Sequence, residues 1–91
     1  MKKRMQYFFT GYVQGVGFRY RAYHSANLLG LTGWVRNEPD GSVSMEVQGD
    51  PDSIDRMLKM IQKSPFIEID RCDSREIPLI PEESSFEISD V

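Results

Sequence analysis

Residues 5–30 read Met-Gln-Tyr-Phe-Phe-Thr-Gly-Tyr-Val-Gln-Gly-Val-Gly-Phe-Arg-Tyr-Arg-Ala-Tyr-His-Ser-Ala-Asn-Leu-Leu-Gly. The stretch begins with the two-residue alternation of a strand and carries aromatic side chains on both faces, which predicts a central strand over 5–13. After a glycine-bearing loop at 14–17 the apolar spacing becomes helical, which predicts a helix over 18–29 that Gly30 ends as a left-handed cap. The apolar positions of this helix are Phe18, Ala22, Ala26 and Leu29.

A hairpin is predicted next. Residues 31–37 and 42–48 both alternate as strands, and residues 38–41, Glu-Pro-Asp-Gly, form the turn between them because Asp-Gly favours hairpins. On the second of these strands three side chains are expected to face the core and three to face outward, namely Val43, Met45 and Val47 against Ser44, Glu46 and Gln48.

A second helix and two more strands follow the hairpin. Asp50 and Pro51 are residue types favoured at the N-cap and the first helical position, and an apolar stripe at helical spacing comes after them. Residues 66–73 alternate as a strand that can extend to Ile77, and residues 85–89 form a short terminal strand.

The order of elements is therefore β-α-β-β-α-β plus a short C-terminal strand. This is the split β-α-β, ferredoxin-like arrangement, an α+β sandwich in which an antiparallel-dominated sheet carries two helices on one face. The 91 residues are expected to form a single domain, 1–91, because the length is too short for two. The fold alone does not indicate a function, since ferredoxin-like domains host many unrelated activities.

The charge is distributed unevenly along the chain. The net charge is −3, which disfavours a nucleic-acid partner. Residues 1–36 contain six Lys or Arg and no acid, whereas residues 37–91 contain five Lys or Arg and all 14 Asp and Glu, so the two parts carry +6 and −9. An anion near the first loop would therefore meet little local repulsion.

The remaining composition indicates a soluble, cytoplasmic protein. No run approaches the ~20 apolar residues that span a bilayer, and the N-terminus lacks a secretory signal, so no membrane partner is expected. The single cysteine, Cys72, excludes an internal disulfide, and with a single histidine, His24, the chain lacks the usual ligands of a zinc site. We expect a monomer.

The loop at 14–17 and the arginine that follows it are the first functional signal. Glycines let the backbone curl so that successive N–H groups point into one hollow, and the helix start adds free N–H groups and the positive end of its dipole. Arg19 is disfavoured in a first helical turn by about 0.3–1 kcal/mol, but its guanidinium fits two phosphate oxygens. The pattern predicts a site for a dianion.

Asn37 is the second functional signal. It ends the strand at 31–37, which runs parallel to the strand at 5–13 in this arrangement, so we expect Asn37 to lie at the same edge of the sheet as the loop. A carboxamide there can hold a water molecule and does not repel a phosphate as a carboxylate would.

Two familiar nucleotide motifs are absent. Gly15 and Gly17 resemble the start of a dinucleotide fingerprint, but Tyr20 stands where the third glycine belongs. No glycine is followed by lysine, as a P-loop requires.

Together, three motifs resemble the acylphosphatase family. They are Gly-Tyr-Val-Gln-Gly-Val-Gly-Phe-Arg at 11–19, Leu-Gly-Leu-Thr-Gly-Trp-Val-Arg-Asn at 29–37 and Asp-Gly-Ser-Val at 40–43. The likeness is close over 11–49 and elsewhere rests on the order of elements. The resemblance implies hydrolysis of acyl phosphates to a carboxylate and inorganic phosphate, without a metal, a cofactor or a covalent phosphoenzyme.

The resemblance also assigns roles to residues. It implies that Arg19 binds the phosphoryl group and that Asn37 orients the attacking water. The backbone amides that would cradle the phosphate are those of Gln14, Gly15, Val16, Gly17 and Phe18.

Two other functions are compatible with the sequence. The first is a module that binds an anionic metabolite or a protein and hydrolyses nothing. The second is a relative of the acylphosphatase-like module at the front of carbamoyltransferase maturation proteins, which the short chain and the single cysteine disfavour. His24, which lies mid-helix, and Cys72, expected to be packed or half-packed on a strand, are not predicted to be catalytic.

Overall fold

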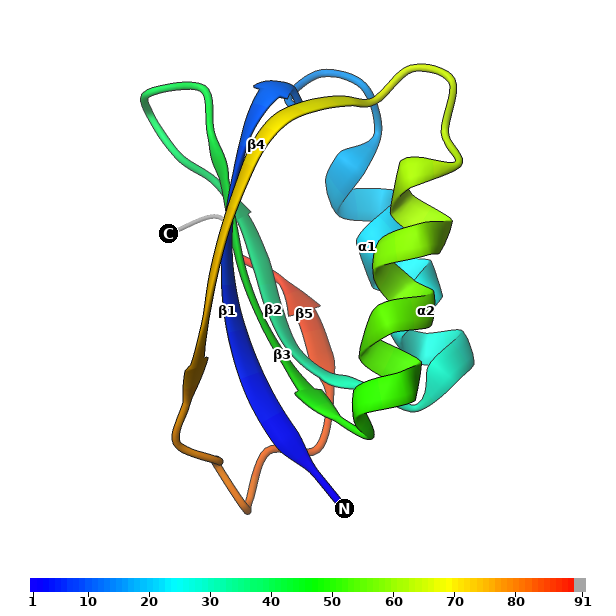
Figure 1. Cartoon of the computed structure of the whole chain (residues 1–91), viewed down its shortest axis with the longest axis vertical. Helices are drawn as coiled ribbons and strands as arrows, with labels where there is room; N and C mark the ends of the chain where they lie inside the picture. The colour runs from blue at the N-terminus through cyan, green and yellow to red at the C-terminus, as the bar shows by residue number, and fades with distance from the viewer. Residues whose placement is uncertain (90–91) are drawn as a thin grey trace.

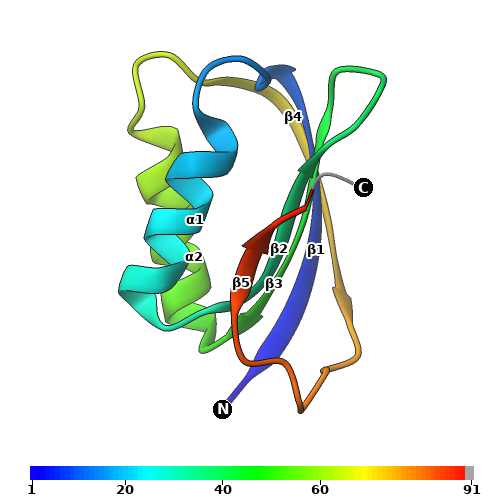
Figure 2. The same ribbon diagram turned by 180° about the vertical axis from the view of Figure 1, so that it is seen from behind.

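A five-stranded sheet with both helices on one face forms the protein, as the computed structural model of residues 1–89 shows (Figures 1 and 2). Along the chain the elements are β1 (Lys3–Tyr12), α1 (Phe18–Leu29), β2 (Thr32–Asn37), β3 (Val43–Gly49), α2 (Pro51–Gln62), β4 (Glu68–Ile77) and β5 (Phe86–Ile88). The predicted ferredoxin-like fold is confirmed, and each predicted element occurs within a few residues of its expected bounds.

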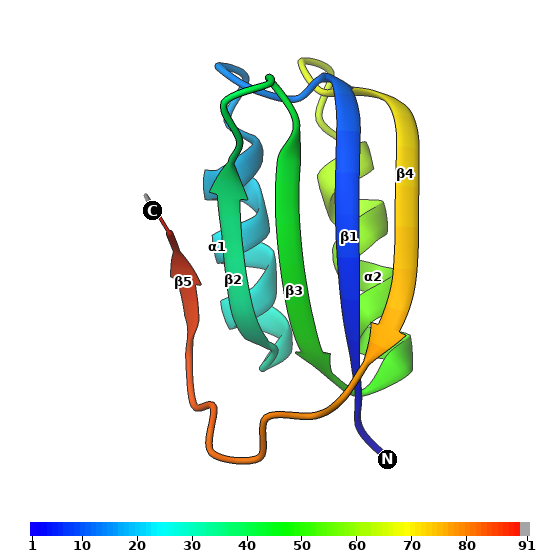
Figure 3. The ribbon, with the colours of Figure 1, turned by 90° about the vertical axis from the view of Figure 1, so that its left-hand side faces the viewer.

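The strands are arranged in the order β4-β1-β3-β2-β5 (Figure 3). β3 is antiparallel to both β1 and β2, so β1 and β2 run in the same direction on either side of it. β5 pairs with β2 in parallel, with Phe86 opposite Gly33, so the predicted terminal strand is part of the sheet.

The core lies between the sheet and the two helices. Its residues come from alternate positions of the strands and from one stripe of each helix, as the two periodicities predict. The most deeply buried members are Phe9, Val13, Phe18, Ala22, Ala26, Val35, Val43, Met45, Val47, Ile54, Met57 and Ile61.

α1 ends and α2 begins where the sequence predicts. Gly30, at φ 69°, closes α1 with its N–H directed at the carbonyls of Ala26 and Asn27. Asp50 caps α2 by accepting a hydrogen bond from the Asp52 N–H at 3.1 Å, and Pro51 is the first helical residue. Termini of this kind satisfy backbone groups that helix ends otherwise leave unpaired.

The outward-facing side chains of β3 point away from the helices as predicted, but part of this outer face is covered. Ser44 and Gln48 point away from the helices, but they are buried rather than exposed. Gln48 is covered by the segment 78–85, which leads from β4 to β5: the backbone of Ile80 exchanges hydrogen bonds of 2.9 and 2.8 Å with the Gln48 side chain. Ser44 instead donates its hydroxyl to Glu38 of the hairpin turn. Strand alternation determines which face a side chain takes, but not whether a loop covers that face.

A buried arginine holds the same segment. Arg4 is 1% exposed and pairs with Glu46 at 2.9 Å and with Glu83 at 2.7 Å, while Gln48 accepts at 3.3 Å. Burial alone would lower the pKa of Arg4, but the hydrogen bonds and charges of Glu83 and Glu46 outweigh it, so the pKa is raised. This cluster joins β1, β3 and the 78–85 segment.

Candidate active site

The glycine loop and the end of β2 lie at the same edge of the sheet. β1 and β2 run in the same direction, so the loop that follows β1 and the hairpin that follows β2 both emerge at the upper edge in Figure 3. α1 starts directly below the loop. The fold therefore brings two sequence-distant segments, 13–19 and 37–42, to one place, as predicted.

The loop backbone is shaped by glycines. Gly15 has φ 72° and Gly17 has φ 81°, both in the left-handed region that side chains other than glycine rarely adopt. Gly17 is also the N-cap of α1 and offers no side-chain cap, and the first turn contains no acidic residue. The free N–H groups and the positive dipole end of α1 are thus left for an anion.

A small cavity of about 240 Å³ opens at this point. It is lined by Val13, Gly15, Gly17, Phe18, Arg19, Tyr20, Asn37 and Ile88. The two side chains predicted to act, Arg19 and Asn37, therefore border the same cavity, together with three of the five predicted loop residues. Ile88 shows that the terminal strand β5 contributes to its wall.

Gln14 and Val16 are not in that lining, although the sequence grouped them with the loop. The Gln14 side chain instead donates from Nε2 to the carbonyls of Glu38 and Ser42, both at 2.8 Å. It thereby ties the glycine loop to the hairpin that carries Asn37. The sequence held no sign of this role beyond the two donors that any carboxamide offers.

Asn37 carries an unusual atom. Its Oδ1 is the one buried side-chain oxygen or nitrogen within residues 1–89 that has no hydrogen-bond partner. Leaving a buried acceptor unsatisfied costs about 1–3 kcal/mol, so each such group in a native protein calls for an explanation. Because Asn37 lines the cavity beside Arg19, an acceptor left without a protein partner there suits a hydrogen-bond donor that belongs to the reaction.

The acids of the hairpin are engaged in its own hydrogen bonds. Glu38 accepts from the Ser44 hydroxyl and from Arg36 Nε at 2.9 Å, and these bonds, the one from Ser44 first, lower the pKa of its carboxyl. Asp40 accepts from the Ser42 hydroxyl at 2.6 Å and from its N–H at 2.9 Å, which lowers the pKa of Asp40. Both groups therefore stabilise the turn beside Asn37 in their ionised form.

Other titratable groups lie away from this cavity. Cys72 was expected to be packed or half-packed, but it is exposed because it lies on the edge strand β4. His24 is exposed on α1 and stacks on Tyr20 at 5.3 Å between ring centroids. Within residues 1–89 no three His, Cys, Asp or Glu side chains are grouped so as to hold a metal ion, and no helix is long and apolar enough to cross a bilayer.

A glycine loop, a first-turn arginine and an asparagine with a buried side-chain oxygen thus meet at one edge of a ferredoxin-like sheet. The model of the acylphosphatase family matches residues 5–88. The chain therefore belongs to the acylphosphatase family, and the family predicted from the sequence is confirmed.

Individual relatives agree with this assignment. An acylphosphatase of Methylococcus capsulatus is 39% identical over 87 residues, which are 94% of this chain and 95% of that protein. One of Bordetella parapertussis is 51% identical over 55 residues, a match that spans 60% of this chain and 58% of that protein. The crystal structure of the acylphosphatase from Bacillus subtilis superposes with a TM-score of 0.87 at 29% identity and covers 98% of this chain and 99% of its own.

Proposed function

We propose that this protein is a metal-independent acylphosphatase, acting as a single domain of residues 1–91 on small acyl phosphates. The observation that carries the proposal is that Arg19 and Asn37 line the same cavity, and that the Asn37 side-chain oxygen is buried without a protein partner. Family membership supports the same activity.

The phosphoryl group would bind at the start of α1. The backbone N–H groups of residues 14–18 surround its oxygens, and the Arg19 guanidinium contacts two of them through its planar fork. Preorganised donors of this kind stabilise charge that develops in the transition state without having to rearrange. Gln14 adds to the cradle indirectly, because its side chain holds the loop against the hairpin.

The reaction would be RCO–OPO₃²⁻ + H₂O giving RCOO⁻ + H₂PO₄⁻. A water molecule that donates a hydrogen bond to Asn37 Oδ1 attacks phosphorus, a new P–O bond forms, and the bond from phosphorus to the acyl oxygen breaks. The carboxylate leaves with the bonding electron pair, and the proton of the water passes to a phosphate oxygen. A carboxylate leaves readily, so positioning and charge stabilisation are the work that remains for the protein.

Two features of the surface bear on where the protein works and on its oligomeric state, namely the exposed cysteine and the two edges of the sheet. An exposed thiol at Cys72 suits a reducing compartment, so we place the protein in the cytoplasm.

β5 covers the β2 edge of the sheet, and the other edge strand, β4, carries charged side chains along most of its exposed length, which disfavours pairing with a second copy. We therefore expect a monomer.

Hydrolysis of acetyl phosphate in excess EDTA tests the proposal. Arg19→Ala should lower kcat/KM by at least about 10²–10³-fold, the loss typical of one preorganised donor. Asn37→Ala should lower kcat while inorganic phosphate still inhibits with unchanged strength. Arg56→Ala, which removes an exposed arginine from α2, is the matched control and should behave as the wild type.

A different result would favour the other function. If the wild type binds phosphate at Arg19 but does not hydrolyse acetyl phosphate above background, the domain is an anion-binding module. If EDTA abolishes turnover, the metal-free mechanism is wrong.

A further inference from the structure

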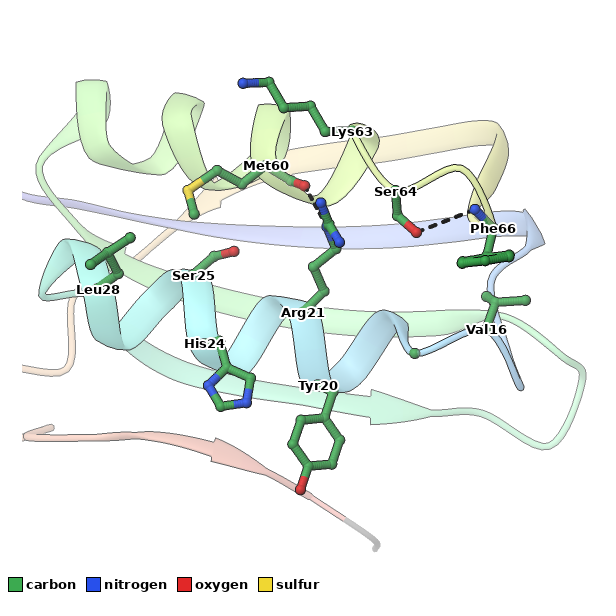
Figure 4. A pocket seen from close by; sticks show the side chains of 11 residues that line it. Val16, Tyr20, Arg21, His24, Ser25, Leu28, Met60, Lys63, Ser64 and Phe66 are labelled. Atoms are coloured by element: carbon green, nitrogen blue, oxygen red, sulfur yellow. Dashed lines mark hydrogen bonds between the residues drawn. The ribbon is translucent and has the colours of Figure 1, made fainter.

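A second and larger cavity lies beside the one already described. It is a groove of about 610 Å³ between α1, the last turn of α2 and the turn at residues 63–66 (Figure 4). Its main side chains are Val16, Tyr20, His24, Leu28, Met60 and Phe66. Val16 and Phe66 lie together at the end near the glycine loop, and Leu28 lies at the far end.

The groove adjoins the smaller cavity that Arg19 and Asn37 line. Gly17 and Tyr20 line both, whereas Asn37 lines only the smaller cavity. Val16, which the sequence placed among the phosphate-binding loop residues, belongs to the groove. One turn of backbone at the start of α1 thus separates the two spaces.

Large apolar side chains are unusually exposed along the groove. Tyr20 is 66% exposed, Leu28 74% and Phe66 72%. A row of this kind beside a polar cavity is typical of a ligand-binding surface rather than of a solvated helix. The titratable groups that line it are Tyr20, Arg21, His24 and Lys63, so no carboxylate of the lining would repel an anionic substrate.

The walls of the groove are already fixed by contacts. Arg21 Nε donates to the Met60 carbonyl at 2.7 Å and so connects α1 to α2. Ser64 Oγ accepts from the Phe66 N–H at 3.3 Å, which orders the turn, and His24 stacks on Tyr20 at an interplanar angle of 30°. A preformed aromatic wall suits a planar or extended apolar group.

The direction of the reaction points to the same place. In phosphoryl transfer the attacking and leaving oxygens lie roughly in line on opposite sides of phosphorus. If Asn37 positions the water, the acyl group must extend from the other side of the phosphoryl group. The boundary shared by the two cavities, at Gly17 and Tyr20, offers such an exit that Asn37 does not line.

We propose that this groove is the acyl-binding subsite and that the protein prefers acyl phosphates with an aromatic or extended apolar acyl group over acetyl phosphate. The proposal rests on the proposed function, because it assigns the other half of the same substrate. The phosphoryl group sits in the small cavity, and the acyl group lies along α1 against Tyr20, Val16 and Phe66.

The test compares two substrates in two variants. The ratio of kcat/KM for benzoyl phosphate to that for acetyl phosphate cancels global effects on the enzyme. Phe66→Ala should lower this ratio by about 2- to 10-fold, the range of one aromatic contact. Phe8→Ala, which truncates a phenylalanine exposed on the outer face of the sheet, is the matched control and should leave it unchanged.

A binding measurement separates failure of the subsite from failure of the activity. With inorganic phosphate present, benzoate should shift the backbone amide NMR signals of Val16 and Phe66, and acetate should not. A ratio that does not respond to Phe66→Ala, with benzoate shifts absent, overturns the subsite even when acetyl phosphate is hydrolysed. If neither substrate turns over while benzoate still shifts these signals, the proposed function fails and the groove remains a binding site for apolar carboxylates.

Discussion

Replacing Arg4 with methionine tests what holds the outer face of the sheet. Methionine keeps an unbranched side chain of similar reach, so the change removes the guanidinium and little of the packing. It leaves two carboxylates, Glu46 and Glu83, facing each other without the cation that joined them. The segment 78–85 then loses its ionic contact with β1 and β3.

The expected cost follows from the geometry. Removing one partner of a buried ion pair typically costs 3–5 kcal/mol, and both carboxylates here are 17% exposed and can partly rehydrate. We therefore expect a loss of about 3 kcal/mol in the free energy of unfolding. A chain of this size has about 5–14 kcal/mol in total, so the melting temperature should fall by about 12–24 °C.

Urea denaturation and thermal melting of the variant measure this loss. Arg4→Met combined with Glu46→Gln and Glu83→Gln should recover at least about 1 kcal/mol, because neutral amides carry no unpaired charge. The activity at 25 °C should be unchanged, since Arg4 lies at the start of β1, roughly 25 Å along the strand from the glycine loop. A loss below about 1 kcal/mol, which is the value of an exposed pair, would refute the reasoning.

Three further outcomes are expected. Gln14→Ala removes two hydrogen bonds between the glycine loop and the hairpin, so Asn37 should be misplaced and kcat for acetyl phosphate should fall about 10- to 100-fold. The free energy of unfolding, measured by urea denaturation, should fall by only about 1–2 kcal/mol. An unchanged kcat would mean that these hydrogen bonds do not position Asn37. Gly33→Ala would place a Cβ 1.9 Å from the Glu46 carbonyl oxygen at φ 139° and should cost at least about 2 kcal/mol, whereas Gly41→Ala, at φ 94° with open space around it, should cost clearly less in the same melts. Burial, with smaller effects of Cys72 and Asp55, raises the pKa of Tyr7 to about 12. The unfolded tyrosine therefore ionises first, and the free energy of unfolding should fall by about 2 kcal/mol as the pH rises from 10 to 12. Tyr7→Phe should abolish this part of the pH dependence and a late step in the absorbance titration at alkaline pH.

Local patterns predicted most of the fold. Alternation over 5–13 and helical spacing over 18–29 depend only on which face of each element is apolar, and both elements lie within two residues of their predicted bounds. The parallel direction of β1 and β2 followed from the order of elements, and it brought Asn37 to the loop. The closeness of Asn37 to the glycine loop was therefore predictable, because the order and direction of the strands alone determine it.

Contacts of irregular segments were not predictable in the same way. The segment 78–85 has no periodicity, so nothing in the sequence indicated that it would cover Gln48 or pair Glu83 with Arg4. The groove beside α1 likewise depends on where the turn at 63–66 places Phe66 relative to Val16. The hydrogen bonds of Gln14 to two carbonyls depend on the distance between two loops, which becomes known only when the sheet is assembled.

The two helices of this protein differ at their N-termini, and this difference supports placing the proposed site at the start of α1. Each has 12 residues and packs on the same sheet, but α2 follows the rules of helix stability at its N-terminus, with a capping Asp50, Pro51 and an acid in the first turn. α1 begins without a side-chain cap, has no acid in its first turn and places Arg19 there instead. A bound phosphate dianion would pair with the N–H groups, the dipole and the guanidinium that α1 leaves together at that end. Natural proteins break local rules of this kind chiefly at functional sites, and here the departures lie at a cavity that is also lined by Asn37, whose side-chain oxygen has no protein partner.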